Sequence, residues 1–153
     1  MLSQTAEYAL RAAVLLARAP DQFVPAAVLA KAAGVPPPYL AKLLGALARA
    51  GLVEARRGPG GGARLAFAPE SLSALDVVEA VEPVARIRHC PLGREEHGTR
   101  LCALHRRIDE AIEATQAALA STTLETLVDR PKERGACRFP AATTAKASGA
   151  RRA

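Results

Sequence analysis

The stretch PAAVLAKAAGVPPPYLAKLLGALARAGLVEARRGPGGGARLAF, residues 25–67, decides the fold of this chain. Its beginning predicts a short helix over residues 25–33, because Pro25 suits a first helical turn and Gly34 favours the conformation that ends a helix. Leucines then recur every three or four residues and predict a second helix over residues 36–50. Two short helices joined by a tight, glycine-containing turn are typical of a helix-turn-helix, whose second helix enters the major groove of DNA.

The end of the same stretch predicts a β-hairpin. Residues 52–57 and 63–67 predict two strands, and the glycine-rich residues 58–62 predict the turn between them. A phosphate-cradling loop would need a helix directly after its glycines and a Lys-Ser or Lys-Thr pair, and neither follows here. The hairpin is therefore expected to be a wing. We expect a mainly α fold in which residues 1–69 form a winged helix-turn-helix DNA-binding domain.

Two further helices are expected on either side of this stretch. Residues 4–19 carry apolar side chains at helical spacing, and Ser3 is placed to cap that helix. Residues 71–81 repeat the pattern, with Ser71 as the expected cap. Pro83 follows and is expected to end the helix.

A long C-terminal helix is expected from Leu101 to about Val128, because apolar residues recur there at spacings near three and four, as along a coiled-coil seam. At 1.5 Å per residue such a helix would be about 42 Å long. A core as small as this chain can build would not cover it. We therefore expect the same helix of a second chain to cover it in a homodimer; packing on its own winged-helix domain alone is the alternative.

The formal charge of +6 is unevenly distributed. Residues 1–69 carry eight Lys or Arg against three acids, residues 70–130 carry seven against eleven, and residues 131–153 carry six against one. A basic surface on a folded domain suits a polyanion, because each neutralised phosphate releases counterions. DNA or RNA is thus the expected partner, although an Arg- and Ala-rich composition can also drift basic. Residues 131–153 lack apolar periodicity and are expected to form a disordered basic tail.

Composition argues against several other classes of protein. No run of eighteen apolar residues exists to span a membrane, and the first five residues lack the pattern of a signal peptide, so we expect a cytoplasmic protein. Trp is absent and only five residues are Phe or Tyr, which disfavours an aromatic-lined substrate pocket. Nucleophilic catalysis by a Cys/His pair would need a third orienting group, which nothing in the sequence indicates. We do not expect an enzyme.

The chemistry-bearing side chains are concentrated in one segment. All three histidines and two of the three cysteines lie within seventeen consecutive residues, as His89, Cys90, His97, Cys102 and His105. Thiolates and imidazoles that converge select zinc or iron–sulfur centres. Cys102 and His105 stand three residues apart at the expected start of a helix, so both can face the same centre.

The same clustering is compatible with three simpler arrangements. A disulfide between Cys90 and Cys102 is one, although such bonds are rare in a reducing compartment. A structural zinc site is the second, but it usually uses close Cys-x-x-Cys pairs, which this segment lacks. In the third, the histidines and cysteines are incidental surface residues without a ligand.

Several segments together resemble the Rrf2 family of bacterial winged-helix transcription regulators, over about residues 1–128. The segments are EYALRA at 7–12, YLAKLL at 39–44, AGLV at 50–53 and RGPGGG at 57–62. The resemblance implies a homodimeric transcription regulator, a repressor of its target genes, in which the long C-terminal helices cross. Each winged helix would then bind half of a pseudo-palindromic operator in double-stranded DNA.

The resemblance also suggests which residues contact DNA. Tyr39 and Lys42, near the start of the second helix, are expected to reach base edges or phosphates. Arg57 resembles the family's minor-groove arginine, and narrow A-tract grooves attract such a side chain electrostatically. The alternative for each charged residue is a solvated surface position. The full expected set is Tyr39, Lys42, Arg56, Arg57, Gly60 and Arg64, with Arg56 and Arg64 on phosphates.

The cluster-binding pattern of the family is only partly present. Its cluster-bearing members use three cysteines, which would fall here at positions 90, 96 and 102, and some add a histidine three residues after the last. Position 96 is Glu96, so the middle cysteine is missing. In other members an acidic residue near the N-terminus of the partner chain supplies a ligand, and Glu7 occupies that place. The resemblance thus implies a 2Fe-2S cluster held by Cys90 and Cys102 together with two of Glu7, His105, His97 and Glu96.

The missing thiolate bears on what such a centre would sense. Neutral imidazole in place of thiolate lowers the negative charge of a cluster and raises its reduction potential, which favours redox sensing. A vestigial site in a regulator without a cluster, or a zinc-stabilised module for protein assembly, remains the alternative. The expected organisation is then a winged-helix domain over residues 1–69, a linker helix, cluster loop (86–105) and dimerisation helix within residues 70–130, and the tail over 131–153.

Overall fold

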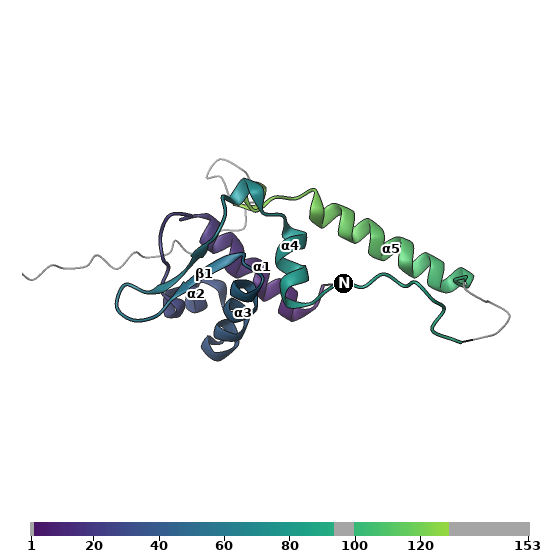
Figure 1. Ribbon diagram of the computed structural model, residues 1–153, viewed down its shortest axis with the longest axis horizontal. Helices are drawn as coiled ribbons and strands as arrows, with labels where there is room; N and C mark the ends of the chain where they lie inside the picture. Colours follow the sequence, from purple (N-terminus) through teal and green to yellow (C-terminus); the bar gives the residue numbers. More distant parts are fainter. Residues whose placement is uncertain (1, 94–99, 129–153) are drawn as a thin grey trace, which may run out of the picture.

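The computed structural model describes residues 2–93 and 100–128, and it confirms a winged helix-turn-helix from which one long helix projects (Figure 1). The expected tail over 131–153, together with Glu96 and His97, lies outside the described residues. Along the chain the elements are α1 (Gln4–Ala17), α2 (Ala26–Ala33), α3 (Pro37–Arg49), β1 (Val53–Arg56), β2 (Gly62–Leu65), the 3-10 helix η1 (Pro69–Ser71), α4 (Ala74–Val81), α5 (Ala103–Ala120) and α6 (Leu124–Leu127).

The core lies around α1, which buries residues on most of its faces. Ser3 caps this helix as expected, accepting the N–H of Ala6 at 3.2 Å. Small alanines along α1 let α2, α3 and α4 approach closely, while Leu40 and Leu47 of α3 are fully buried against it. Every buried side chain in residues 2–93 and 100–128 is apolar, so the polar residues discussed below all lie at or near the surface.

The helix-turn-helix forms where the sequence predicts it. Gly34 ends α2 in the left-handed conformation, with φ +67°. The N–H of Val35 donates back to the carbonyl of Ala30 at 3.0 Å, so the turn is closed before α3 begins. The leucines of α3 at 40, 43, 44 and 47 are buried, which leaves the opposite face of this helix to solvent.

The wing is an antiparallel hairpin in which Val53 pairs with Leu65 and Arg56 with Gly62. At its tip the N–H of Gly61 donates to the carbonyl of Gly58 at 2.9 Å. Pro59 and Gly60 (φ +72°) occupy the two central positions, as in a type II turn. An isolated bridge from Val24 to Ala63 adds the segment before α2 to the base of the hairpin.

The C-terminal helix differs from the sequence-based prediction. A single helix to Val128 is wrong, because α5 ends at Ala120 and α6 begins four residues later. Hydroxyl side chains compete for backbone partners in the break, and the Thr123 side chain caps α6. The break directs Leu124 into the core, where it is fully buried and its N–H donates to the carbonyl of Leu72 at 2.8 Å. The 18 residues of α5 then span about 27 Å.

The cap of α4 also differs from expectation. Ser71 belongs to η1, and Ser73 caps α4 instead. The Ser73 hydroxyl accepts the N–H of Asp76, and the Asp76 carboxylate accepts the N–H of Ser73 at 2.8 Å. This reciprocal capping box satisfies two backbone donors, which is why the cap lies two residues later than predicted.

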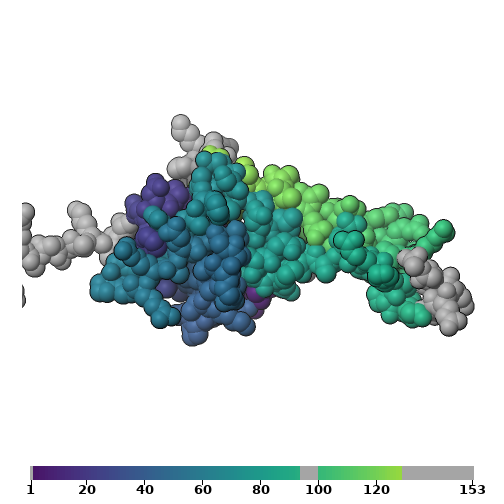
Figure 2. All heavy atoms as spheres, viewed as in Figure 1, coloured from purple at the N-terminus to yellow at the C-terminus, as the bar shows by residue number. Residues whose placement is uncertain are grey.

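The helix α5 lies along one side of the molecule and projects beyond the winged helix (Figures 1 and 2). None of its side chains is buried in the described part of the chain, and Leu104 and Ile108 are 62% and 41% exposed. No helix of the described residues has the length and apolar character needed to cross a membrane.

The wing provides a test of its own packing. A Cβ at Gly62 (φ +144°) would lie 2.1 Å from the carbonyl oxygen of Val24, whereas a Cβ at Gly58 (φ +86°) would meet nothing within 4 Å. Gly58→Ala should therefore cost only backbone strain, about 1 kcal/mol of unfolding free energy. Gly62→Ala should cost about 3 kcal/mol or more, because Val24 must also move. Urea denaturation followed by circular dichroism measures both, and equal losses would contradict this account.

Candidate metal centre and nucleic-acid interface

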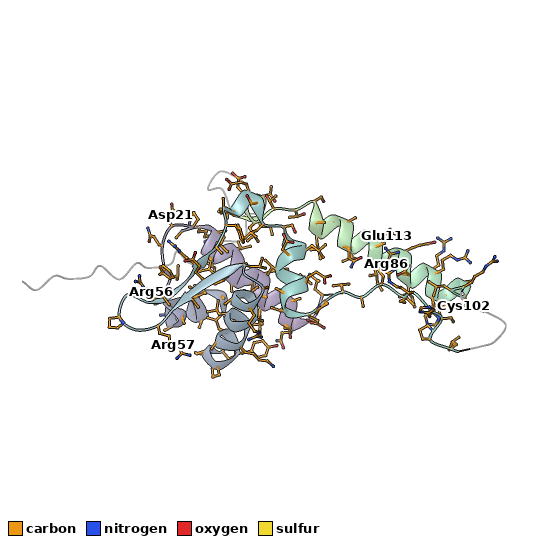
Figure 3. All side chains as sticks on the ribbon, in the orientation of Figure 1. Asp21, Arg56, Arg57, Arg86, Cys102 and Glu113 are labelled. Atoms are coloured by element: carbon orange, nitrogen blue, oxygen red, sulfur yellow. The ribbon has the colours of Figure 1, made fainter. Side chains whose placement is uncertain are left out.

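Cys90, Cys102 and His105 come together at the N-terminal end of α5, where Figure 3 labels Cys102. The Nδ1 atom of His105 lies 3.6 Å from the Cys90 sulfur and 3.2 Å from the Cys102 sulfur. All three donor atoms lie within 4.8 Å of one another and all three residues are half-buried. The structure therefore brings together three of the residues that the sequence singles out.

The spacing of these donors suits a shared metal. A sulfur at about 2.3 Å and a nitrogen at about 2.1 Å from one tetrahedral ion lie roughly 3.6 Å apart. The two sulfur–nitrogen distances match or fall slightly below that value. Two thiolates and an imidazole suit zinc or an iron of an iron–sulfur cluster. Neither cysteine forms a disulfide.

Local backbone structure aims the donors. Cys102 precedes the first residue of α5, and its carbonyl accepts the N–H of Arg106 at 2.9 Å. His105 follows three residues later, so its ring lies over the same side of the first turn. On the other segment a tight turn follows Cys90, with the N–H of Gly93 donating to the Cys90 carbonyl at 3.2 Å and Gly93 at φ +58°.

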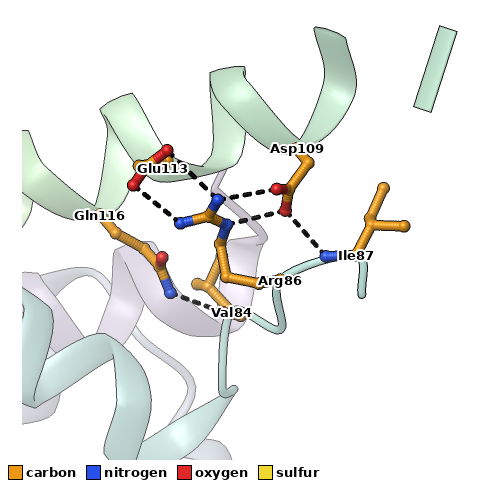
Figure 4. A network of polar contacts seen from close by, with 6 residues as sticks. All are labelled: Val84, Arg86, Ile87, Asp109, Glu113 and Gln116. Carbon is orange, nitrogen blue, oxygen red and sulfur yellow. Dashed lines mark hydrogen bonds and ion pairs between the residues drawn. The ribbon is translucent and has the colours of Figure 1, made fainter. Parts of the chain in front are cut away.

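A polar network beside the centre was not predicted from the sequence (Figure 4). The guanidinium of Arg86 donates through Nε and Nη2 to the two oxygens of Asp109, both at 2.7 Å. Glu113, one turn further along α5, also pairs with Arg86 at 3.1 Å. The N–H of Ile87 donates to Asp109 at 2.9 Å. The segment before Cys90 is thereby fastened to α5.

The network shifts the acidity of its members. Hydrogen bonds from Arg86 outweigh partial desolvation and lower the pKa of Asp109 to about 2, with the Ile87 N–H contributing in the same direction. The same hydrogen bonds, from Asp109 first and then Glu113, raise the pKa of Arg86 above its ordinary value. Asp109 is therefore ionised at every physiological pH.

The expected DNA-contacting residues lie on the winged helix in different settings. Lys42 is exposed on α3 and Arg57 is exposed beside the wing tip, next to Gly60. The side chains of Arg56 and Arg57 point to opposite sides of the hairpin, as those of consecutive residues near a strand end do (Figure 3). Both Lys42 and Arg57 are thus placed where a duplex could reach them, and their DNA contacts stay a prediction.

The other expected DNA contacts have partners within the protein. Arg64 pairs with Glu54 at 2.9 Å and lies 4.7 Å from the centre of the Phe23 ring, which Arg56 approaches at 5.7 Å. The Tyr39 hydroxyl lies 2.6 Å from that of Thr5. These side chains therefore also stabilise the winged helix, a role that their positions in the sequence did not indicate.

The remaining expected metal ligands are not part of this group in the described residues. Glu7 lies on α1, where it forms an ion pair with Arg11, and it is not among the donors that converge in the described residues. His89 is exposed. Glu96 and His97 lie outside the described residues.

Comparison with known proteins identifies the family. The model of the Rrf2 family, described as an iron-dependent transcriptional regulator, matches residues 2–130. This chain belongs to the Rrf2 family. It is 39% identical over 118 residues to the HTH-type transcriptional regulator IscR of Cereibacter sphaeroides, an alignment that covers 74% of this chain and 76% of that relative.

Solved structures of Rrf2-family regulators share the fold. CymR of Staphylococcus aureus superposes with a TM-score of 0.68 at 26% identity, over 86% of this chain and all of that one. IscR of T. potens gives a TM-score of 0.68 at 23% identity, over 83% and 85% of the two chains. The Rrf2 chain described here is therefore a winged-helix transcriptional regulator, and DNA binding follows from its family.

The ionisation of Asp109 can be tested by titration. A carboxylate whose folded pKa is depressed contributes stability above its unfolded value near 3.9, and that contribution disappears as pH falls toward about 2. We expect the carboxyl carbon resonance of Asp109 to show no transition between pH 7 and 3. Arg86→Ala should raise the pKa of Asp109, whereas Arg107→Ala, which unpairs the neighbouring Glu110, should not. A wild-type midpoint near pH 4 would refute the assignment.

Proposed function

We propose that this Rrf2 protein is a homodimeric repressor whose affinity for its operator is controlled by a 2Fe-2S cluster held by Cys90, Cys102 and His105. The observation that carries this proposal is the convergence of two sulfurs and an imidazole nitrogen within 4.8 Å. When bound, a cluster with imidazole ligation supplies a redox couple at higher potential than an all-thiolate one. The family description as iron-dependent supports the same conclusion.

A fourth ligand is needed to complete such a centre, and Glu7 of a second chain is our first candidate. Its side chain is 55% exposed and its pairing with Arg11 is of the surface kind, which contributes little and can be exchanged. Glu7 does not converge with Cys90, Cys102 and His105 of its own chain, so in this proposal it reaches the centre from the partner chain. Glu96 and His97 are the other candidates.

The surface of α5 supports a dimer. The exposed side chains of Leu104, Ile108 and Thr115 stand four and seven residues apart, which places them along one face of α5 as in a helix-pairing stripe. A groove of about 380 Å³ runs beside it, lined by Leu2, Val84 and Ile112 among others. Burying these apolar side chains against a second α5 would remove them from water, which is favourable at about 25 cal/mol per Å².

Regulation requires that the two states of the centre differ in their fit to DNA, because a signal shifts an equilibrium only by its differential affinity. The centre in this proposal bridges the linker, α5 and the partner's winged helix. A change at the centre would then alter the spacing of the two recognition helices, which must match half-sites one helical turn apart. The basic charge of residues 1–69 supplies the attraction to the phosphates.

Reconstitution tests the cluster. Anaerobic protein treated with iron and sulfide should gain visible charge-transfer absorption, and Cys102→Ser should abolish it. Cys137→Ser is the matched control and should keep the colour. Iron, sulfide and zinc analysis of the same samples separates the outcomes: a colourless protein that holds zinc, or no metal, would overturn the proposal.

The wing arginine tests the DNA surface. On an operator selected from random duplexes, Arg57→Ala should weaken binding by about 1–3 kcal/mol, the worth of a specific groove contact. Arg107→Ala removes an equally charged, exposed residue of α5 and should leave affinity unchanged. Fluorescence anisotropy over a range of salt concentrations measures both, and equal effects of the two substitutions would argue against the wing contact.

A further inference from the structure

Residues 84–90, called the linker segment here, run antiparallel along α5 and are tied to it at successive helical turns (Figure 4). The carbonyl of Val84 accepts the side-chain amide of Gln116 at 2.7 Å. As the residue number along the linker segment rises, the residue number of its contact on α5 falls, which is the antiparallel arrangement. The ties in order are Val84 with Gln116, Arg86 with Glu113 and Asp109, Ile87 with Asp109, and Cys90 with His105.

Asp109 makes the central contact between the linker segment and α5. Its two oxygens receive three donors, two from the Arg86 guanidinium and one from the backbone of Ile87, and its side chain is only 15% exposed. A bidentate arginine–carboxylate pair fixes direction as well as distance. The pair therefore sets the register of the linker segment on α5, which a single hydrogen bond would leave free to slide.

That register decides where Cys90 lies. Asp109 stands one helical turn after His105, about 6 Å along the axis, so both face the linker segment. Cys90 is the third residue after Ile87, a span of at most about 10 Å. Holding the Ile87 N–H on Asp109 thus confines the Cys90 sulfur to the neighbourhood of His105. Cys102 and His105 need no such help, because both belong to the start of α5.

We propose that Asp109 and Arg86 are positioning residues of the metal centre, which deliver Cys90 to the two donors that α5 already holds together. This inference rests on the proposed function in so far as the three donors bind a metal. The same segment also reaches the winged helix: the N–H of Val84 donates to Glu79 of α4 at 3.1 Å. The register that delivers Cys90 therefore also joins the centre to α4, whose Val77 and Val78 are buried.

The test uses Co²⁺ as the probe and the full-length chain carrying Cys137→Ser, so that Cys90 and Cys102 are the only thiols. Asp109→Asn keeps the shape of the side chain but removes its charge and one acceptor. We expect it to weaken Co²⁺ binding by about 10–100-fold, as loss of a supporting contact does. The thiolate-to-cobalt charge-transfer absorption should fall to that of Cys90→Ser, because one of two sulfurs is lost from the ion.

Two comparisons separate positioning from a general effect on folding. Glu110→Gln makes the same change of charge one residue away, on a carboxylate that pairs with Arg107 instead, and should leave Co²⁺ binding unchanged. In a Cys90→Ser background, Asp109→Asn should cause no further loss of affinity. A residue that acts only through the stability of α5 would weaken binding in both backgrounds.

The outcomes are distinct. If Asp109→Asn binds Co²⁺ like the wild type, or weakens it equally without Cys90, the positioning role is overturned while the metal site stands. If the wild type binds no Co²⁺, the proposed site fails, and the positioning role is decided on metal-free protein. In the metal-free protein, diamide oxidises Cys90 and Cys102 to a disulfide and itself accepts the two electrons and two protons that they lose. The rate of disulfide formation should be lower in Asp109→Asn than in Glu110→Gln, and equal rates would overturn the inference.

Discussion

Polar contacts, and not an apolar core, hold α5 in place, and the rest of this structure depends on that constraint. An apolar core usually holds a helix in place, yet none of the side chains of α5 is buried in the described part of the chain. Its C-terminal end is anchored by Leu124, which follows the break after Ala120. Its N-terminal half is held through Arg86 and Asp109. The position of the candidate metal centre at that end therefore depends on these polar contacts.

The winged helix was predictable from the sequence because local signals determine it. Gly34 ends α2 by its left-handed conformation. In the wing, Gly58 and Gly60 take positive φ, and Gly61 and Gly62 leave no room for a Cβ. The end of α5 was not predictable in the same way. The apolar pattern continues past Ala120, and only the burial of Leu124 in the core reveals why the helix stops. Tertiary packing there overrides periodicity.

The candidate site was predicted in part for a similar reason. Cysteines and histidines are rare enough that their clustering carries information, so Cys90, Cys102 and His105 could be found in the sequence alone. Arg86 and Asp109 are common residues that lie 23 positions apart, and no spacing rule connects a linker to a helix. Arg64 shows the opposite difficulty: its charge suggested phosphate binding, while the structure gives it Glu54 and Phe23 as partners.

Charge explains how two cysteines and a histidine can share a site at the surface. Burying ionised thiolates without compensation is costly, and half-buried donors avoid most of that cost. The Arg86 charge is already engaged by Asp109 and Glu113, so the network does not present an unpaired cation to the centre. The network can therefore hold the linker segment in register without competing for the thiolates. Because the guanidinium is already paired, Arg86 acts on the centre through the position of the linker segment and not through an uncompensated charge beside the sulfurs.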